Sequence, residues 1–491
     1  MTCQGPQSLT YTRRSLELRA AEYYASIRKP QDQWRTIEDL APQLAEFEHR
    51  VRAKDYDSAY QLIEAIDGNY LLLWGHYTRL ISLRTQLLGH IADRRRCANN
   101  QGRLGLAYQN QGRYAQASTL YKAALGIARE IQDREEECAE IHRLGTVARV
   151  TGQITQALQY YQTSLALALD RETFDVNTFR LEDVVIEDID SRLGIWISDL
   201  GSVHRCLGQM DLAIKAYGLA LQIDRRIGER RWEVADLLRL GSVYRDQGEF
   251  VPAIEYYQAT RALAETIHYR KGKMIAQGLL GTVYRLRGDL ETAIDLHGEA
   301  LEVATEIGDA RGTRYQRLGL AKLMLAQGRS AEALDYCQAA LDLDLPDIGD
   351  SAALVLGMVY LREDFEVAGE IFQKVAARCC AILDETADLH LPRYTLATAL
   401  VGQAVCDPGW PDPGQRTALL APALAEYRRA LDIAAAPGIV HDALHDLELI
   451  RAAGIEGLEP AFALLEQAVA NWQPLSDDAL LFPTRSEEDT L

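Results

Sequence analysis

The chain has 491 residues, a formal net charge of −19, and 48% hydrophobic and 25% charged residues, the composition of an ordinary soluble protein. The negative charge argues against bulk electrostatic attraction to nucleic acid or anionic membranes. No apolar run approaches the roughly 20 residues needed to cross a bilayer, and the N-terminus lacks the apolar core of a signal peptide. The eight Cys are scattered without paired CxxC motifs, which indicates reduced thiols and a cytoplasmic location.

The N-terminal part of the chain is predicted to be a helical cap. Residues 1–13 form a flexible lead, and an amphipathic run that begins at Arg14 predicts the first helix. A second helix is expected from about Trp34 to Ala53, followed by another turn and helix. The segment 69–90 is the most apolar part of this region, so it should pack beneath the first regular repeat. These helices together make up a cap or junction over residues 14–93.

From residue 94 to 345 a two-helix unit recurs, and its first complete copy is Leu104–Leu125, LGLAYQNQGRYAQASTLYKAAL. Within each copy, Gly, Tyr and Gly lie three and four residues apart, as do Ala, Tyr and Ala, so each set marks one helical face. Small residues allow close approach of neighbouring helices, and the second Gly suits the end of the first helix, because a left-handed residue costs little without a β-carbon. The first small residue of each of the six copies is Gly105, Gly145, Gly201, Gly241, Gly281 and Ala321.

This pattern resembles the tetratricopeptide repeat. The usual repeat has about 34 residues, whereas Gly105 and Gly145 lie 40 positions apart, as do Gly241 and Gly281, which implies longer helices. Similar 40-residue repeats are known in cell-polarity adaptors and bacterial signalling proteins. The predicted fold is an all-α, right-handed α-solenoid of helix-turn-helix repeats with helical caps.

A second resemblance covers residues 15–90. The runs EYYASIRKP, WRTIEDLAPQLAEFEHRVRAKDYDSA and DGNYLLLWGHYTRLISLRTQL are similar to the junction that precedes the repeats in bacterial STAND-type signalling ATPases. No GxxxxGK[ST] phosphate loop occurs in the sequence, and Gly272 with Lys273 lacks its other elements. The resemblance therefore implies a sensor arm without its ATPase, with an NTPase or signalling module in trans as a possible partner.

The remaining segments are an insert and a C-terminal region. Gly145 and Gly201 are 56 positions apart, so about 16 residues are inserted, and the acidic insert is placed at about 170–192. It is either a longer helix with a solvated loop or a flap that contacts a partner. Residues 346–472 are predicted to be degenerate repeats and a C-terminal helical cap, and residues 473–491 a disordered tail.

The most informative polar positions lie on the first helix of each repeat. Four residues after the first Gly stand Arg149, Arg205, Arg245 and Arg285 in four consecutive repeats. The resemblance places this position in the inner groove. Neighbouring positions add basic and hydroxyl side chains, namely Arg103, Arg143, Arg239, Ser202, Ser242 and Thr282.

A groove with these side chains suits an acidic segment of a protein or peptide, because the guanidinium group binds carboxylates in bidentate geometry. The alternative is that each Arg pairs with an Asp or Glu of an adjacent repeat. Exposed pairs of that kind contribute roughly 0–1 kcal/mol to stability.

The motif HDALH places His441 and His445 one helical turn apart, as a zinc site would. It lacks the Glu of HExxH and a third ligand, so surface or capping histidines are expected. The sequence contains no nucleophile elbow, paired-carboxylate motif or dinucleotide-binding Gly loop.

We therefore expect a non-catalytic scaffold or sensor without a cofactor or metal, which recognises a protein or peptide in its concave groove. One alternative is a cytoplasmic receptor for a short signalling peptide or small ligand that regulates a partner. A more remote alternative is a metal-dependent hydrolase built on HDALH.

Overall fold

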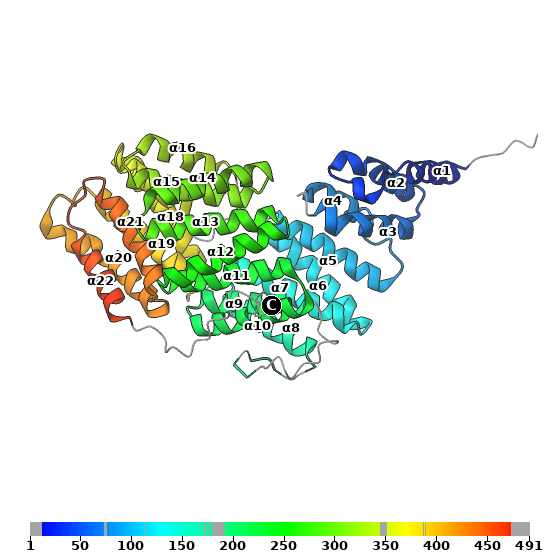
Figure 1. The fold of residues 1–491 in the computed structure, drawn as a ribbon, viewed down its shortest axis with the longest axis horizontal. Helices are drawn as coiled ribbons and strands as arrows, with labels where there is room; N and C mark the ends of the chain where they lie inside the picture. Colours follow the sequence, from blue (N-terminus) through cyan, green and yellow to red (C-terminus); the bar gives the residue numbers. More distant parts are fainter. Residues whose placement is uncertain are drawn as a thin grey trace, which may run out of the picture. The chain divides into compact units, whose positions relative to one another are not determined.

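The structure is a computed structural model (Figure 1). The residues that it describes are 12–72, 76–111, 113–170, 173–175, 177–178, 192–343, 351–385, 387 and 389–472. The tail and most of the lead and of the acidic insert predicted from the sequence lie outside these residues. All regular elements of the described part are helices, and none of these helices has the length and apolar character of a membrane span.

The chain divides into two compact units, and each is described by itself. The first comprises Met1–Val147 and Leu167–Asp170, and the second comprises Ala148–Ala166 and Arg171–Leu491. The helices of the first unit are α1 (Arg13–Ser26), η1 (Gln31–Gln33), η2 (Ile37–Leu40), α2 (Ala41–Arg52), α3 (Tyr56–Ile66), η3 (Asp67–Leu71), α4 (Tyr77–Thr85), α5 (Arg94–Asn110), α6 (Tyr114–Glu130) and most of α7 (Arg134–Val150).

The helix expected from about Trp34 to Ala53 is shorter than predicted. It begins at Ala41 as α2, after the separate short helix η2. Thr36 and Asp39 form a capping box at the N-terminus of η2. The extended chain therefore ends at Thr36, and the short helix begins after it. Pro42 is tolerated because it lies in the first turn of α2, where a missing N–H breaks no helical hydrogen bond.

A buried arginine organises the polar part of the N-terminal core. The side chain of Arg84 is fully buried, and its guanidinium group donates to Asp67 at 2.7 Å, Asn100 at 3.1 Å and Glu64 at 2.6 Å. Glu64 lies on α3, Asp67 on its continuation η3 and Asn100 on α5. Arg84 of α4 therefore links these helices. A buried guanidinium group requires such acceptors, because an uncompensated charge would be costly.

The second unit contains the remaining helices, and each helix from α9 to α19 contacts the next one along the chain. They are α8 (Ile154–Ala168, which ends in the first unit), α9 (Leu193–Cys206), α10 (Met210–Ile227), α11 (Arg230–Asp246), α12 (Phe250–Thr266), α13 (Arg270–Leu286), α14 (Leu290–Glu306), α15 (Ala310–Ala326), α16 (Ser330–Leu341), α17 (Ser351–Tyr360), α18 (Phe365–Glu385), α19 (His390–Cys406), α20 (Pro413–Ile433), α21 (Pro437–Arg451) and α22 (Glu459–Asn471).

Close helix packing at Gly105, Gly201, Gly241 and Gly281 confirms the steric role predicted for the first Gly of the repeat. A β-carbon at Gly241 would lie 2.7 Å from the ring of Tyr257, and one at Gly281 would lie 2.7 Å from the ring of His297. The second Gly of each described repeat has a positive φ, for example 80° at Gly248 and 83° at Gly288, as a helix C-terminus favours. The repeat skeleton therefore follows from backbone proximity and helix termination.

The first helices of successive repeats form a continuous row in the second unit. Helix α9 contacts α11, α11 contacts α13, and the series continues through α15, α17, α19 and α21. The row curls so far that α21 also contacts α11, α13 and α15 (Figure 1). Helix α21, which belongs to the predicted C-terminal cap, therefore also contacts the first helices of earlier repeats.

The interface between α10 and α11 contains two buried carboxyl groups. Both oxygens of Asp224 and one oxygen of Asp236 are buried without a hydrogen-bond partner in the described structure, although Ser198 and Arg239 bond to the other oxygen of Asp236. Burial and the neighbouring Asp236 raise the pKa of Asp224 well above its ordinary value. The pair is therefore most stable when it shares a proton.

The substitution Asp224→Asn should stabilise the protein at alkaline pH. Because the pKa of Asp224 is raised in the folded state, the wild type loses stability as the pH rises from the unfolded pKa through the folded one. Asparagine lacks this titration, and its amide can donate to Asp236. We expect a gain of about 1–2 kcal/mol at pH 8 and a smaller gain at pH 5, measured by urea unfolding.

The matched control is Asp295→Asn, because Asp295 is exposed in the middle of α14. Its effect should be small at both pH values. A destabilised Asp224→Asn variant at pH 8 would show that the carboxylate pair is satisfied in its ionised form.

Candidate functional site: the inner groove and its pocket

The candidate site lies in the second unit, on the inner ends of the first helices. Arg205, Arg245 and Arg285 each stand in the last turn of α9, α11 and α13. A cation in the last turn also interacts favourably with the helix dipole. Because the three positions are 40 residues apart and the repeats stack regularly, the structure brings these guanidinium groups to one surface.

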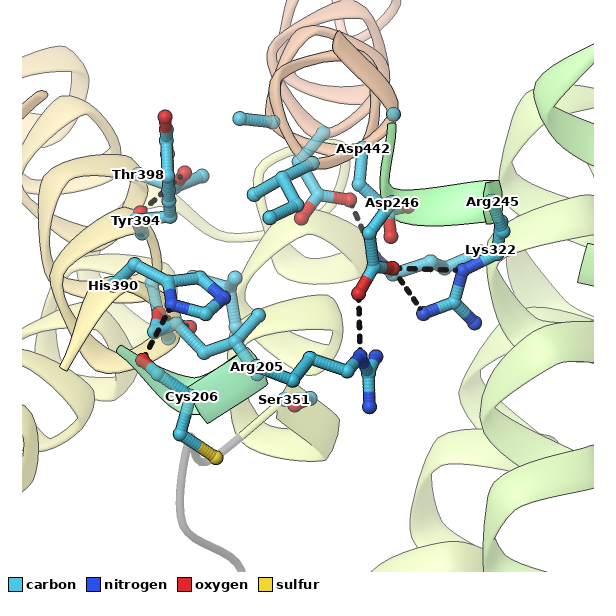
Figure 2. Close-up of a pocket in the computed structure, with 17 residues that line it drawn as sticks. Arg205, Cys206, Arg245, Asp246, Lys322, Ser351, His390, Tyr394, Thr398 and Asp442 are labelled. Carbon is cyan, nitrogen blue, oxygen red and sulfur yellow. Dashed lines mark hydrogen bonds and ion pairs between the residues drawn. The ribbon is translucent and has the colours of Figure 1, made fainter. Parts of the chain in front are cut away.

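Asp246, the last residue of α11, binds two of these arginines. Its Oδ2 accepts from Nε of Arg205 at 2.6 Å, and its Oδ1 accepts from Nη2 of Arg245 at 2.6 Å (Figure 2). Burial would raise the pKa of Asp246, but the two arginines outweigh burial and hold it below its ordinary value. Among the described residues, none accepts a hydrogen bond from the two terminal nitrogens of Arg205, whose side chain is 32% exposed.

Helix α21 supplies two further carboxylates to the groove. Asp442 accepts from Arg285 at 2.5 Å, and Asp446, one turn later, accepts from Lys322 of α15 at 2.7 Å. Burial opposes ionisation of Asp442, but Arg285 and Lys322 outweigh it and lower the pKa of this carboxyl, whereas burial raises the pKa of Asp446. The side chain of Arg285 is only 4% exposed, so Asp442 neutralises a largely buried cation.

A pocket of about 180 Å³ lies between the repeats, α19 and α21. Figure 2 shows Arg205, Asp246 and His390 among its lining side chains. His390 donates from Nδ1 to the carbonyl oxygen of Cys206 at 2.9 Å, and burial lowers its pKa, so the ring is neutral near pH 7. Pockets for drug-sized ligands have about 300–1,000 Å³, so this one suits a single polar side chain or a small polar molecule.

Three of the predicted groove residues form hydrogen bonds within the repeats, and two of them bond to the paired helix. The hydroxyl groups of Ser202, Ser242 and Thr282 donate to carbonyl groups one turn earlier in their own helices. Ser202 and Ser242 also accept from Tyr217 and Tyr257, both at 3.1 Å. Ser202 and Ser242 therefore fix the aromatic residue of their own repeat, whereas Thr282 bonds to Tyr315 of the next repeat.

The remaining predicted arginines do not line the pocket. Arg239 binds Ser198, Asp236 and Asp199, and the Nε of Arg149 lies 3.4 Å from the hydroxyl of Tyr161. The other two belong to the first unit, where Arg143 pairs with Glu136 and Glu140, and Arg103 lies near Gly68. The structure thus brings together Arg205, Arg245 and Arg285 at the pocket and at α21.

Sequence reasoning missed the acidic side of the groove and His390. Lys322 stands one residue after Ala321, at the position that Ser202 and Ser242 hold in other repeats. Asp442 and Asp446 lie four residues apart in HDALHD, and this spacing was the signal that could have been found. The interpretation of that motif considered its histidines instead.

The sequence interpretation expected surface or capping histidines in HDALH, but the side chain of His445 is largely buried. Its side chain is 15% exposed, and burial together with Arg285 and Lys322 lowers its pKa to about 3. His441 lies against the ring of Phe250, with centroids 6.4 Å apart. Among the described residues, no group of three or more His, Cys, Asp or Glu side chains is placed to hold a metal ion.

Comparisons with known proteins agree with the repeat prediction. Residues 95–170 match the family model described as tetratricopeptide repeat, and residues 187–345 match the model described as MalT-like TPR region. The chain therefore contains tetratricopeptide repeats, as the Gly and Tyr spacing predicted. No curated protein sequence matches the chain.

Several solved structures are similar in fold. The Rap conjugation gene regulator of plasmid pLS20, in complex with the Phr* peptide, is 12% identical with a TM-score of 0.50, over 74% of this chain and 95% of that one. A Rap protein complexed with competence and sporulation factor has 15% identity and a TM-score of 0.44, over 76% and 100%.

A STAND protein with a tetratricopeptide repeat sensor from Pyrococcus horikoshii is 16% identical with a TM-score of 0.42. The match covers 86% of this chain and 54% of that protein, so this chain spans about half of its length. At these identities the likeness concerns the fold alone.

Acidic pH should weaken the packing of α21 through His445. Its folded pKa of about 3 lies below the unfolded value of 6.5, so stability is lost as the pH falls from about 6.5 towards 3. The loss from this group should reach about 2 kcal/mol at pH 5. His445→Gln should therefore lose less stability than the wild type between pH 7 and pH 5, measured as the shift in urea midpoint.

The control is His268→Asn, which replaces an exposed histidine with positive φ by a residue that tolerates that conformation. It should leave the acid sensitivity of the wild type unchanged. Equal acid sensitivity of His445→Gln and the wild type would mean that His445 is protonated in the folded protein.

Proposed function

We propose that this protein is a non-catalytic sensor or scaffold that binds an acidic segment of a protein or peptide in the inner groove of its repeats. The binding surface comprises Arg205, Arg245 and Arg285 with the pocket between them and α21. The observation that carries the proposal is that this surface already accepts carboxylates from a helix outside the row α9 to α15, namely Asp442 and Asp446 of α21. Carboxylate recognition is therefore a property of the groove.

The pocket beside α21 supports binding of an external segment. Arg205 retains donor capacity there after its bond to Asp246, and its guanidinium group remains partly exposed. A carboxylate that enters the pocket would meet a planar group with two nitrogens in bidentate geometry. The volume of about 180 Å³ admits one acidic side chain or a peptide carboxylate.

A short peptide is the second candidate ligand, in place of a folded protein. The Rap regulator of plasmid pLS20, which has the same fold, was solved in complex with the Phr* peptide. Peptide recognition is thus compatible with this arrangement of helices. An NTPase or signalling module in trans fits the first candidate, in which the repeats report ligand binding to a protein partner.

The test is capture of partners from native lysate with the wild-type chain, followed by affinity measurement on the acidic segment of each captured protein. The variant Arg205→Lys/Arg245→Lys keeps the charge that neutralises Asp246 but loses the planar fork. We expect a loss of affinity of at least about tenfold, equivalent to 1.4 kcal/mol, with an unchanged urea midpoint. Affinity should also fall as salt is raised.

Arg226→Lys/Arg311→Lys is the matched control, because both side chains are exposed on α10 and α15. It should bind like the wild type. Partners held equally by the groove variant and the wild type would contradict recognition through these arginines.

A further inference from the structure

We propose that α21 is an internal ligand of the inner groove and that the external partner is an acidic amphipathic helix that displaces it. The inference rests on the proposed function and specifies its partner. It follows from the position of α21 across three repeats, from the spacing of its carboxylates and from a close contact at its N-terminus. Each of these features concerns a different part of the helix.

Helix α21 is the last helix of the row and also contacts earlier helices of the row, as a bound segment would. It contacts α11, α13 and α15, which belong to three successive repeats. A helix that only continued the solenoid would pack on its immediate predecessors, whereas α21 also contacts helices more than 100 residues earlier in the chain. Its contacts therefore combine those of a terminal repeat with those of a groove ligand.

The polar contacts of α21 follow a helical spacing. Asp442 and Asp446 share one face because they are four residues apart, and they bind Arg285 and Lys322 from two successive repeats. Ile439 and Ala443 line the pocket from the same side of the helix. The residues of α21 that contact the groove thus follow the pattern Ile-x-x-Asp-Ala-x-x-Asp. This pattern is typical of an amphipathic helix with two carboxylates one turn apart.

The N-terminus of α21 fits tightly against the end of α11. A β-carbon at Gly438 would lie 1.8 Å from the carbonyl oxygen of Arg245, and one at Gly248 would lie 3.1 Å from Pro437. A side chain at position 438 would therefore push the start of α21 out of the groove. This offers a way to release α21 without altering a charged residue.

An external helix that binds Arg285 and Lys322 must displace α21, because Asp442 and Asp446 already pair with these side chains. The side chain of Arg285 is only 4% exposed and pairs with Asp442, so an external carboxylate would reach it by taking the place of Asp442. Helix α21 is joined to α20 by residues 434–436, so it competes at an effective concentration of about millimolar. A free helix must displace this competitor, so the apparent affinity of the groove for a free helix depends on how tightly α21 is bound.

The test uses a fluorescent, N-acetylated peptide of residues 437–451 and the full chain. It should bind the Asp442→Asn/Asp446→Asn chain at least about tenfold more tightly than the wild-type chain, because the internal competitor is weakened. Gly438→Val is a second way to release α21 and should act in the same direction. The same peptide with both aspartates changed to asparagine should lose this binding.

Two controls separate charge from folding. The double variant Asp432→Asn/Glu448→Gln removes two exposed acids outside the groove contacts, and it should bind the peptide like the wild type. Circular dichroism should show that all chains are folded. Hydrogen exchange of the wild type should show α21 opening at least tenfold more often than α11.

Folded variants that bind the peptide no better than the wild type would overturn the inference, as would an α21 that exchanges only through global unfolding. The lysate capture above distinguishes this failure from that of the proposed function. Partners that depend on Arg205 and Arg245 but bind equally to the wild type and to the released chains would leave the function standing and reject α21 as a competitor.

Discussion

The packing of an aromatic ring against a glycine backbone is the constraint on which the arrangement of the repeats depends. Tyr257 against Gly241 and His297 against Gly281 set how closely the two helices of a repeat approach. Repetition of this contact every 40 residues aligns α11 with α13, and the same spacing brings their last turns to one surface. The groove is therefore a consequence of repeated close packing, and its chemistry depends on which side chains occupy those last turns.

The cations of the groove pair locally with carboxylates, four cations with three carboxylates, although the chain carries a net charge of −19. Asp246 binds Arg205 and Arg245, and two aspartates of α21 bind Arg285 and Lys322. Buried cations need such partners, because desolvation without pairing costs several kcal/mol. An external acidic helix must therefore replace existing carboxylates or use the remaining donors of Arg205, and the first route makes binding a competition between similar contacts.

Much of the fold could be predicted from the sequence, because its signals are local and repeated. The spacing from Gly241 to Gly281, the aromatic positions and the glycines at the helix ends predicted the helix pairs. The arginines four residues after the first Gly of successive repeats were recognised from the same regular spacing. The burial of His445, interpreted as a surface or capping residue, was missed, and the start of α2 was placed too early. Burial and capping depend on neighbours that a linear pattern does not show.

The sequence by itself determined the repeat unit, its helices and the regular placement of Arg205, Arg245 and Arg285, since these follow from offsets within 40 residues. Only the tertiary structure decided that the row of helices curls until α21 contacts α11. In the same way, Asp442 of α21 binds Arg285 of α13, which lies 157 residues earlier in the chain. Small angles between successive repeats add up along the solenoid, so contacts this distant depend on the accumulated geometry. That accumulation places Asp442 and Asp446 in the groove.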